Sequence, residues 1–199
     1  MKSDIARIQR KLGVAADGIV GPVTVRALLH TLQLDSNTTA SPAEQWPTQA
    51  EVRSGRSIFG AAGCEHELLN LIPPYPFFYE GQQVRTIRLH RLIAAPVQDA
   101  LREVLAYYGQ EEIERLGLNL YGGSYNYRNT TGGKSLSMHA WGIALDFSPA
   151  ANACHMRAPR ATLSHPDCEA WWQIWERHGA TSMGRARGYD WMHLQFARL

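Results

Sequence analysis

Histidine and aspartate side chains in two short segments have the types and the spacing to bind a metal ion. In residues 135–149 (SLSMHAWGIALDFSP), His139 precedes Asp146 by seven positions. Apolar residues alternate around Asp146 as they do in a strand, which places its carboxylate on the face opposite Leu145 and Phe147. Because an unpaired carboxylate among apolar residues is costly, Asp146 needs a partner, either a hydrogen-bonded histidine or a metal ion.

The second segment, residues 190–196 (DWMHLQF), supplies another histidine. Its alternation places His193 on the polar side of a terminal strand, with Asp190 where that strand begins. Two imidazoles and one carboxylate, from His139, His193 and Asp146, leave a fourth position open to water, as in catalytic zinc sites. Structural zinc sites are instead closed by four ligands. Asp190, outside this set, could accept a proton from a water whose pKa the metal lowers to about 7.

Short strands and helices must position these side chains. The alternation over residues 86–90 predicts a half-buried strand, and Pro96 opens a helix that Gly109 ends. Residues 167–178 form a second predicted helix, whose three tryptophans we assign to the core rather than to a sugar-stacking surface. Prolines predict an irregular segment over residues 57–80. Because strands and helices do not alternate as βαβ units, we expect an α+β domain.

The N-terminal part of the chain is organised differently. Apolar residues recur at helical spacing before Gly13 and again after Pro22, which predicts two short helices around an Asp17-Gly18 turn. The stretch that follows is rich in Ser, Thr, Pro and Asn and has no apolar period, as is typical of a linker. We therefore expect a helical module over residues 1–34, a linker over residues 35–56 and a larger domain over residues 57–199.

The composition limits the class of partner. The 199 residues include 20 Lys and Arg against 18 Asp and Glu, so bulk charge does not favour binding to nucleic acid. No apolar run reaches the roughly 18 residues of a membrane-spanning helix, and the charged start, MKSDIARIQRKLG, does not resemble a signal peptide. We expect a monomer without membrane insertion, made in the cytoplasm and dependent on release if it acts elsewhere.

The cysteines leave three interpretations open. Cys154, His155, His165 and Cys168 have the residue types of a second metal site, but an ordinary loop with free thiols is the favoured interpretation. One disulfide between Cys154 and Cys168 is the other alternative, although three cysteines are too few for a disulfide framework.

Taken together, the two metal-ligand segments resemble one family. Their pattern is Ser137-x-His139-x-x-Gly142-x-Ala144-x-Asp146, followed by Asp190-x-x-His193. It is similar to that of the zinc peptidases of peptidoglycan, which comprise D-Ala-D-Ala carboxypeptidases, VanX- and VanY-type enzymes and phage L-alanyl-D-glutamate endopeptidases. The resemblance covers residues 85–199 and implies a Hedgehog/DD-peptidase-like fold with one zinc ion per chain. It implies that His139, Asp146 and His193 bind the zinc and that Asp190 is the general base.

The same resemblance suggests residues that contact the substrate. Arg128, in the segment GGSYNYRN, would stabilise the oxyanion, and a permanently charged guanidinium is chemically suited to that role or to binding a substrate carboxylate. Ser137 would contact the substrate, and we expect Tyr127, Trp141 and Trp191 to line the cleft. One departure is Ser182-Met183-Gly184, which stands where this family often has Trp-Gly-Gly.

The N-terminal segment has a resemblance of its own. IQRKLGVAADGIVGPVTVRALL resembles the peptidoglycan-binding module of cell-wall hydrolases, whose hallmark is Asp-Gly-Ile-x-Gly-Pro-x-Thr. The matching residues are Asp17, Gly18, Ile19, Gly21, Pro22 and Thr24. The glycines suit a tight turn and the proline suits the start of a helix, so a helical hairpin without a ligand is the alternative.

These observations favour a phage endolysin. We expect a zinc metallopeptidase that is anchored to the wall, is released through a holin and cuts the L-Ala-D-Glu bond of the peptidoglycan stem peptide. A D-Ala-D-Ala carboxypeptidase of cell-wall remodelling is the alternative within the same family. A zinc- or wall-binding module without catalysis is an alternative of another class, against which the presence of both Asp190 and Arg128 argues.

Overall fold

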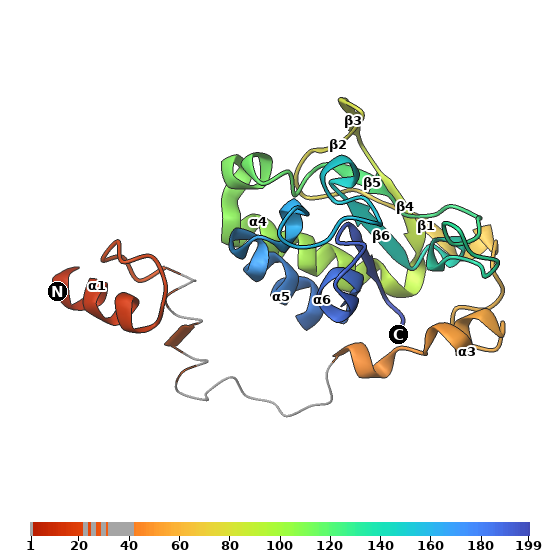
Figure 1. The fold of residues 1–199 in the computed structure, drawn as a ribbon, viewed down its shortest axis with the longest axis horizontal. Coiled ribbons are helices and arrows are strands. Elements are labelled where there is room, and N and C mark those ends of the chain that lie inside the picture. The colour runs from red at the N-terminus through yellow and green to blue at the C-terminus, as the bar shows by residue number, and fades with distance from the viewer. Residues whose placement is uncertain (1, 22–23, 25–26, 29–30, 32–41) are drawn as a thin grey trace. The chain divides into compact units, whose positions relative to one another are not determined.

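The chain divides into two compact units, Met1–Thr39 and Ala40–Leu199 (Figure 1). The computed structural model describes residues 2–21, 24, 27–28, 31 and 42–199. The predicted helical module lies in the first unit, and the predicted catalytic domain lies in the second.

In the first unit, the buried side chain of Gln9 connects the residues of the Asp-Gly-Ile motif. Gln9 belongs to helix α1 (Lys2–Lys11). Its Nε2 donates hydrogen bonds to Asp17 Oδ1 at 2.7 Å and to Thr24 Oγ1 at 2.9 Å. Its Oε1 accepts a hydrogen bond from Gly18 N at 2.8 Å. The motif residues Asp17, Gly18 and Thr24 therefore hold the predicted turn together.

The turn requires glycine at position 18. Gly18 has a φ of 74°, and a Cβ there would lie 2.9 Å from Lys2 O. Pro22 lies outside the described residues, as does much of the predicted second helix. Of that helix, the described residues Thr24, Ala27, Leu28 and Thr31 are helical.

The prediction of a linker over residues 35–56 is wrong over its second half. A 3-10 helix, η1 (Pro42–Gln45), and helix α3 (Gln49–Arg53) occupy this stretch. Thr48 caps α3 in a capping box, because Thr48 Oγ1 accepts from Glu51 N and the Glu51 carboxylate accepts from Thr48 N at 2.6 Å. Residues 35–41 lie outside the described residues.

This stretch packs on the second unit. The Trp46 ring stacks on Phe59 with ring centroids 5.7 Å apart and meets the edge of Phe196 at 5.8 Å. Gln49 N donates a hydrogen bond to Arg198 O at 2.8 Å, beside the C-terminus. Residues 42–56 thus contribute to the body of the second unit.

The second unit mixes helices with short antiparallel strands, in agreement with the predicted α+β class. One pair consists of β1 (Leu68–Leu71) and β4 (Ile87–His90), and another of β2 (Phe77–Tyr79) and β3 (Gln82–Val84). The largest sheet has the order β5 (Tyr121–Gly123), β6 (Ala144–Phe147), β8 (His193–Gln195) and β7 (Thr181–Ser182).

The central pair of this four-stranded sheet places two candidate ligands side by side. Every residue of β6 and β8 is buried, and the antiparallel register pairs Asp146 with His193. Paired residues of neighbouring antiparallel strands point to the same face of a sheet. The two predicted strands thus bring an acid and an imidazole together that are 47 positions apart in the sequence.

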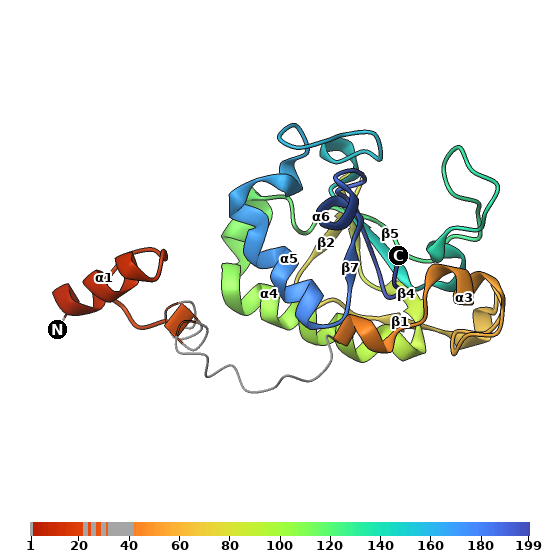
Figure 2. The same cartoon turned by 60° about the horizontal axis from the view of Figure 1, so that its bottom comes forward.

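Helices cover the sheet and form the core with it. They are α4 (Ala94–Arg115), α5 (Glu169–Arg177) and α6 (Met183–Arg187), and α4 and α5 run side by side in both views (Figures 1 and 2). Phe147 of β6 packs against Trp171 and Trp175 of α5, with ring centroids 5.3 and 5.8 Å apart. Both tryptophans are fully buried, which confirms their predicted place in the core.

Gly109 ends the helix that was predicted to open near Pro96. Its φ of 71° and ψ of 167° are not helical, and a second helical segment follows across a kink to Arg115, so α4 combines two helices. Short 3-10 helices complete the unit: η2 (Glu65–Glu67), η3 (Arg91–Ile93), η4 (Met138–Trp141), η5 (Pro149–Ala151), η6 (Thr162–Ser164) and η7 (Pro166–Cys168). Among the residues that the structure describes, no helix combines the length and the apolar character needed to cross a bilayer.

The prediction of an irregular segment over residues 57–80 is also wrong in part. Strands β1 and β2 lie within it, and β1 pairs with β4 so that Leu71 faces Ile87. The prolines fall between the two strands, so they limit the length of each strand but leave its pairing intact. Strands of four and three residues carry too little alternation to be recognised from the sequence.

Candidate metal centre

His139, Asp146 and His193 form a buried cluster that could hold a metal ion. Their possible ligand atoms lie within 4.8 Å of one another. His139 Nε2 is 3.2 Å from Asp146 Oδ2 and 3.2 Å from His193 Nδ1, and His193 Nδ1 is 2.9 Å from Asp146 Oδ1. Two nitrogens and one carboxylate thus converge on a single point.

A short 3-10 helix, η4, positions His139. Ser137 caps it, and the Ser137 Oγ accepts a hydrogen bond from His139 N at 3.4 Å. Gly142 ends it with a φ of 68°, and a Cβ at this position would lie 2.7 Å from Leu68 Cδ2. Glycine is therefore required between the first ligand and strand β6.

Each histidine is held by its other ring nitrogen. His139 Nδ1 lies 2.5 Å from the Ser124 carbonyl oxygen, and His193 Nε2 lies 3.2 Å from Gln195 Oε1. Both oxygens are acceptors, so each of these nitrogens carries the ring proton. Such contacts leave the lone pairs of His139 Nε2 and His193 Nδ1 aimed at the cluster, as in established metal sites.

The charges of the cluster suit a cation. Burial by itself would raise the pKa of Asp146, but the two neighbouring histidines outweigh it and hold that pKa well below its usual range. Burial would likewise lower the pKa of His193, but the hydrogen bond to Asp146 and the charges of Asp146 and Asp190 raise it. An ionised carboxylate therefore stands between two imidazoles.

A cleft of about 320 Å³ opens onto this cluster. Its lining includes the predicted residues Asp190, Arg128 and Ser137, together with Gln49 and Arg53 of α3. Helix α3 comes from the stretch predicted as a linker, so its contribution to the cleft was missed. The Thr48-x-x-Glu51 capping box was the one signal in the sequence that could have indicated a helix there.

Asp190 occupies a strained position in the cleft. Its φ of 56° is unusual for a residue other than glycine, and its backbone is fixed by hydrogen bonds with Cys154 O and His193 N, both at 3.1 Å. Its Oδ1 is buried without a hydrogen-bond partner. Burial is the main reason that the pKa of Asp190 is raised, and the Asp146 charge adds to it. Strain and an unpaired buried acid are typical of a functional position.

Arg128 lies on a loop beside the first ligand. Its carbonyl oxygen accepts a hydrogen bond from Ser137 N at 3.0 Å, and its guanidinium donates to Asn129 O at 3.1 Å. Arg53 Nε donates to Leu136 O at 3.0 Å. Within residues 42–199, neither arginine forms an ion pair with an acid. Both positive charges are available to a ligand.

Three predicted substrate contacts lie elsewhere. Trp141 is buried in the core, where its Nε1 donates to Gly60 O at 3.0 Å. Trp191 packs against Gly184, and Tyr127 is exposed and lies against Gly63. None of the three lines the cleft, so we assign the two tryptophans to packing. Only Ser137 of the predicted contacts lies in the cleft, where contact with substrate remains a prediction.

The second metal site considered for Cys154, His155, His165 and Cys168 is not formed. Among the described residues, His139, Asp146 and His193 are the single group of three or more such side chains that meet. All three cysteines are free thiols, which also excludes the Cys154–Cys168 disulfide in this structure. Burial raises the pKa of Cys168 to about 11, so its thiol stays protonated.

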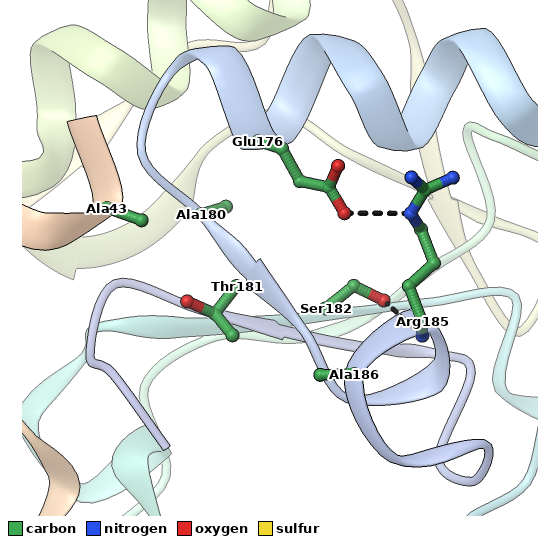
Figure 3. A pocket seen from close by; sticks show the side chains of 7 residues that line it. All are labelled: Ala43, Glu176, Ala180, Thr181, Ser182, Arg185 and Ala186. Atoms are coloured by element: carbon green, nitrogen blue, oxygen red, sulfur yellow. Dashed lines mark hydrogen bonds and ion pairs between the residues drawn. The ribbon is translucent and has the colours of Figure 1, made fainter. Parts of the chain in front are cut away.

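A second hollow, of about 410 Å³, lies between η1, α5 and α6 (Figure 3). Arg185 spans it and pairs with Glu176 at 2.8 Å, as Figure 3 shows. It also pairs with Glu169 at 2.5 Å. Its charges are mutually satisfied, which favours a structural role. The ion pairs fix α6, whose first residue, Met183, lines the cleft.

We found no match for this chain among protein-family profiles, curated proteins or solved structures. A functional assignment therefore depends on the chemistry of the site and on the motif resemblance.

Proposed function

We propose that this protein is a zinc-dependent peptidase of peptidoglycan. The observation that carries the proposal is the convergence of His139 Nε2, His193 Nδ1 and the Asp146 carboxylate at a cleft that also contains Asp190 and Arg128. Nitrogen and oxygen donors without a cysteine, open on one side to a cleft, are typical of catalytic rather than structural zinc sites.

The three side chains suit zinc in donor type and in protonation. His139 and His193 each hold a proton on the outward nitrogen, and Asp146 is ionised, so all three present lone pairs. Zinc bound by them would supply a Lewis acid for the scissile carbonyl and lower the pKa of water.

Two residues outside the cluster would carry the proton and the developing charge. Asp190, with its unpaired oxygen in the cleft, accepts the proton of the attacking water and returns it to the leaving amine. Because the pKa of Asp190 is raised, it is closer to the pKa of the leaving amine than the pKa of an ordinary aspartate is. The Arg128 guanidinium donates hydrogen bonds to the oxyanion.

The proposed substrate is the peptidoglycan stem peptide, cut at the L-Ala-D-Glu bond. The motif resemblance supports this bond and the assignment as a phage endolysin that acts on the wall after release. The unpaired guanidinium groups of Arg53 and Arg128 support an acidic peptide, because the D-Glu residue next to that bond carries a carboxylate. The first unit would bind the wall through the turn around Gln9.

Digestion of purified muropeptides, followed by mass spectrometry, tests the proposal. An endopeptidase leaves a free L-Ala carboxylate on the glycan and a new D-Glu amine, and a chelator abolishes both products. Loss of terminal D-Ala would instead establish the carboxypeptidase alternative. An unchanged muropeptide profile with zinc-loaded protein would leave only the binding-module alternative.

The Asp190→Ala variant separates catalysis from metal binding. It should lose hydrolysis, by at least about 100-fold, because a general base contributes roughly 10² to 10⁴ in rate. Zinc should still bind, since His139, Asp146 and His193 are intact. Retained hydrolysis, or loss of zinc from this variant, would overturn the role given to Asp190.

A further inference from the structure

We propose that Gln195, held by Gln49, is a positioning residue that fixes the His193 ring for metal binding. The inference rests on the proposed metal centre and extends it to two residues that no motif of the sequence assigns. Gln195 lies two positions after His193 on strand β8, so both side chains point to the same face. Only 1% of Gln195 is exposed.

Three hydrogen bonds determine how the Gln195 amide is oriented. Its Nε2 donates to the Ala197 carbonyl oxygen at 2.7 Å, which requires the NH₂ group on that side. Its Oε1 therefore faces the other way, where it accepts from Gln49 Nε2 at 3.0 Å and lies 3.2 Å from His193 Nε2. Every polar atom of this buried amide is satisfied.

The orientation of the amide dictates the tautomer of His193. Because Gln195 Oε1 can only accept, the proton of a neutral His193 ring resides on Nε2. The Nδ1 lone pair is then directed at His139 Nε2 and Asp146 Oδ1, which lie 3.2 and 2.9 Å away. A residue that orients a metal-binding histidine through its second nitrogen changes metal affinity by about 10 to 100-fold when it is lost.

Gln49 connects this arrangement to helix α3. The Thr48 capping box and the hydrogen bond from Gln49 N to Arg198 O hold the beginning of that helix in place. Gln49 Nε2 provides the second donor to Gln195 Oε1, which stops the buried amide from turning over. Helix α3 thus forms part of the support of the candidate metal centre.

Zinc affinity of full-length variants, measured by competition with a chromophoric chelator, tests the inference. Gln195→Leu should weaken zinc binding about 10 to 100-fold, because His193 Nε2 loses its acceptor. Gln195→Glu should keep the zinc affinity within about threefold of that of the wild type, since a carboxyl oxygen at this position can still accept a hydrogen bond from His193 Nε2. Gln49→Leu should weaken zinc binding less than Gln195→Leu does.

The exposed Gln83→Leu variant is the matched control and should bind zinc as the wild type does. Thermal unfolding of the metal-free variants shows which of them fold. If Gln195→Leu does not fold, Gln49→Leu and Gln195→Glu still decide the question. As a second readout, NMR of the zinc-loaded protein should show a His193 Nε2 proton protected from exchange in the wild type and in Gln195→Glu, but less protected in Gln49→Leu.

The outcomes separate this inference from the proposed function. Equal zinc affinity in the wild type, Gln195→Leu and Gln49→Leu would overturn the positioning role and leave the peptidase proposal standing. A wild-type protein that binds zinc with the predicted order of variants but cleaves no muropeptide would support the positioning role and overturn the peptidase. A wild-type protein that binds no zinc would overturn both.

Discussion

At the scale of single residues, Asp190 lowers the stability of the fold and leaves a carboxylate unpaired in the cleft. Its backbone is in the left-handed region and its Oδ1 is buried without a partner. Both features cost folding free energy, and both keep a carboxylate free beside the candidate metal ligands. Relief of this cost should be measurable when the charge is removed.

Asp190→Asn should make the metal-free protein more stable at pH 7, by on the order of 1 kcal/mol. Burial raises the pKa of Asp190 in the folded state above its unfolded value of about 4. The cost in folding free energy of the ionised Asp190 carboxylate is therefore absent below pH 4. It is fully present once the pH exceeds the pKa of Asp190 in the folded state. Asparagine tolerates the left-handed backbone, so the change adds no strain.

Urea unfolding in a chelator at several pH values between 4 and 7 measures this difference. The gain from Asp190→Asn should shrink as the pH falls toward 4. A variant that is less stable than the wild type at pH 7, or a gain that does not depend on pH, would contradict the account of Asp190 as a strained and unpaired acid.

Arg53 offers a second test at this scale. Its guanidinium lines the cleft and pairs with no acid within residues 42–199, so its charge is free for a substrate carboxylate. Arg53→Ala should raise the KM for an acidic stem peptide about tenfold, the usual effect of a lost charged hydrogen bond, and leave kcat within about threefold. Hydrolysis kinetics with peptides whose D-Glu carboxylate is free or amidated provide the measurement. An equal effect on both peptides would argue against carboxylate recognition.

At the scale of elements, the wall of the cleft depends on a close approach between α6 and the segment before β8. The Trp191 ring lies directly over Gly184, where an added Cβ would be only 2.4 Å from the ring. Arg185 ties the same helix to α5 through Glu169 and Glu176. Within Ser182-Met183-Gly184, Gly184 is therefore the residue whose small size this packing requires.

Gly184→Ala should destabilise the protein by about 1 to 3 kcal/mol, the usual cost of overpacking, because a rigid indole cannot move aside. Trp191 directly follows Asp190 in the chain, so strain at this contact should reach Asp190 and lower hydrolysis as well. Thermal unfolding and muropeptide assays measure the two effects. Gly21→Ala is the control, since a Cβ there meets nothing within 4 Å. Equal stability of the two variants would contradict the contact.

At the scale of the whole molecule, the structure moves the boundary between the first and the second unit toward the N-terminus. Residues 42–56 belong to the body of the second unit, where Trp46 packs against the core and Gln49 contacts Gln195. A deletion that extends to residue 56, the predicted end of the linker, would remove both Trp46 and Gln49. A deletion that ends at residue 41 leaves both in place.

Deletion of residues 1–41 should leave hydrolysis of soluble muropeptides within about twofold and lower hydrolysis of intact cell walls at least tenfold, because the second binding site is lost. Deletion of residues 1–56 should weaken zinc binding and stability in addition. Assays on both substrates, with zinc affinity, compare the two proteins. Equal behaviour of the two deletions would contradict the assignment of residues 42–56.

The sequence by itself determined which residues are the candidate metal ligands. Residue type, spacing and alternation are local properties. Strand periodicity therefore selected Asp146 and His193, and residue type and the spacing to Asp146 selected His139, before any fold was known. The buried tryptophan helix α5 and the turn at Gly18 followed from equally local signals.

Only the tertiary structure decided what surrounds those ligands. Gln49 and Gln195 are 146 positions apart, and no local pattern links them. The strain at Asp190 and the placement of Trp141 in the core likewise depend on packing between segments distant in the sequence. Periodicity reveals which face of an element is apolar, but the partners of that face are chosen by long-range packing, which a single sequence does not encode locally.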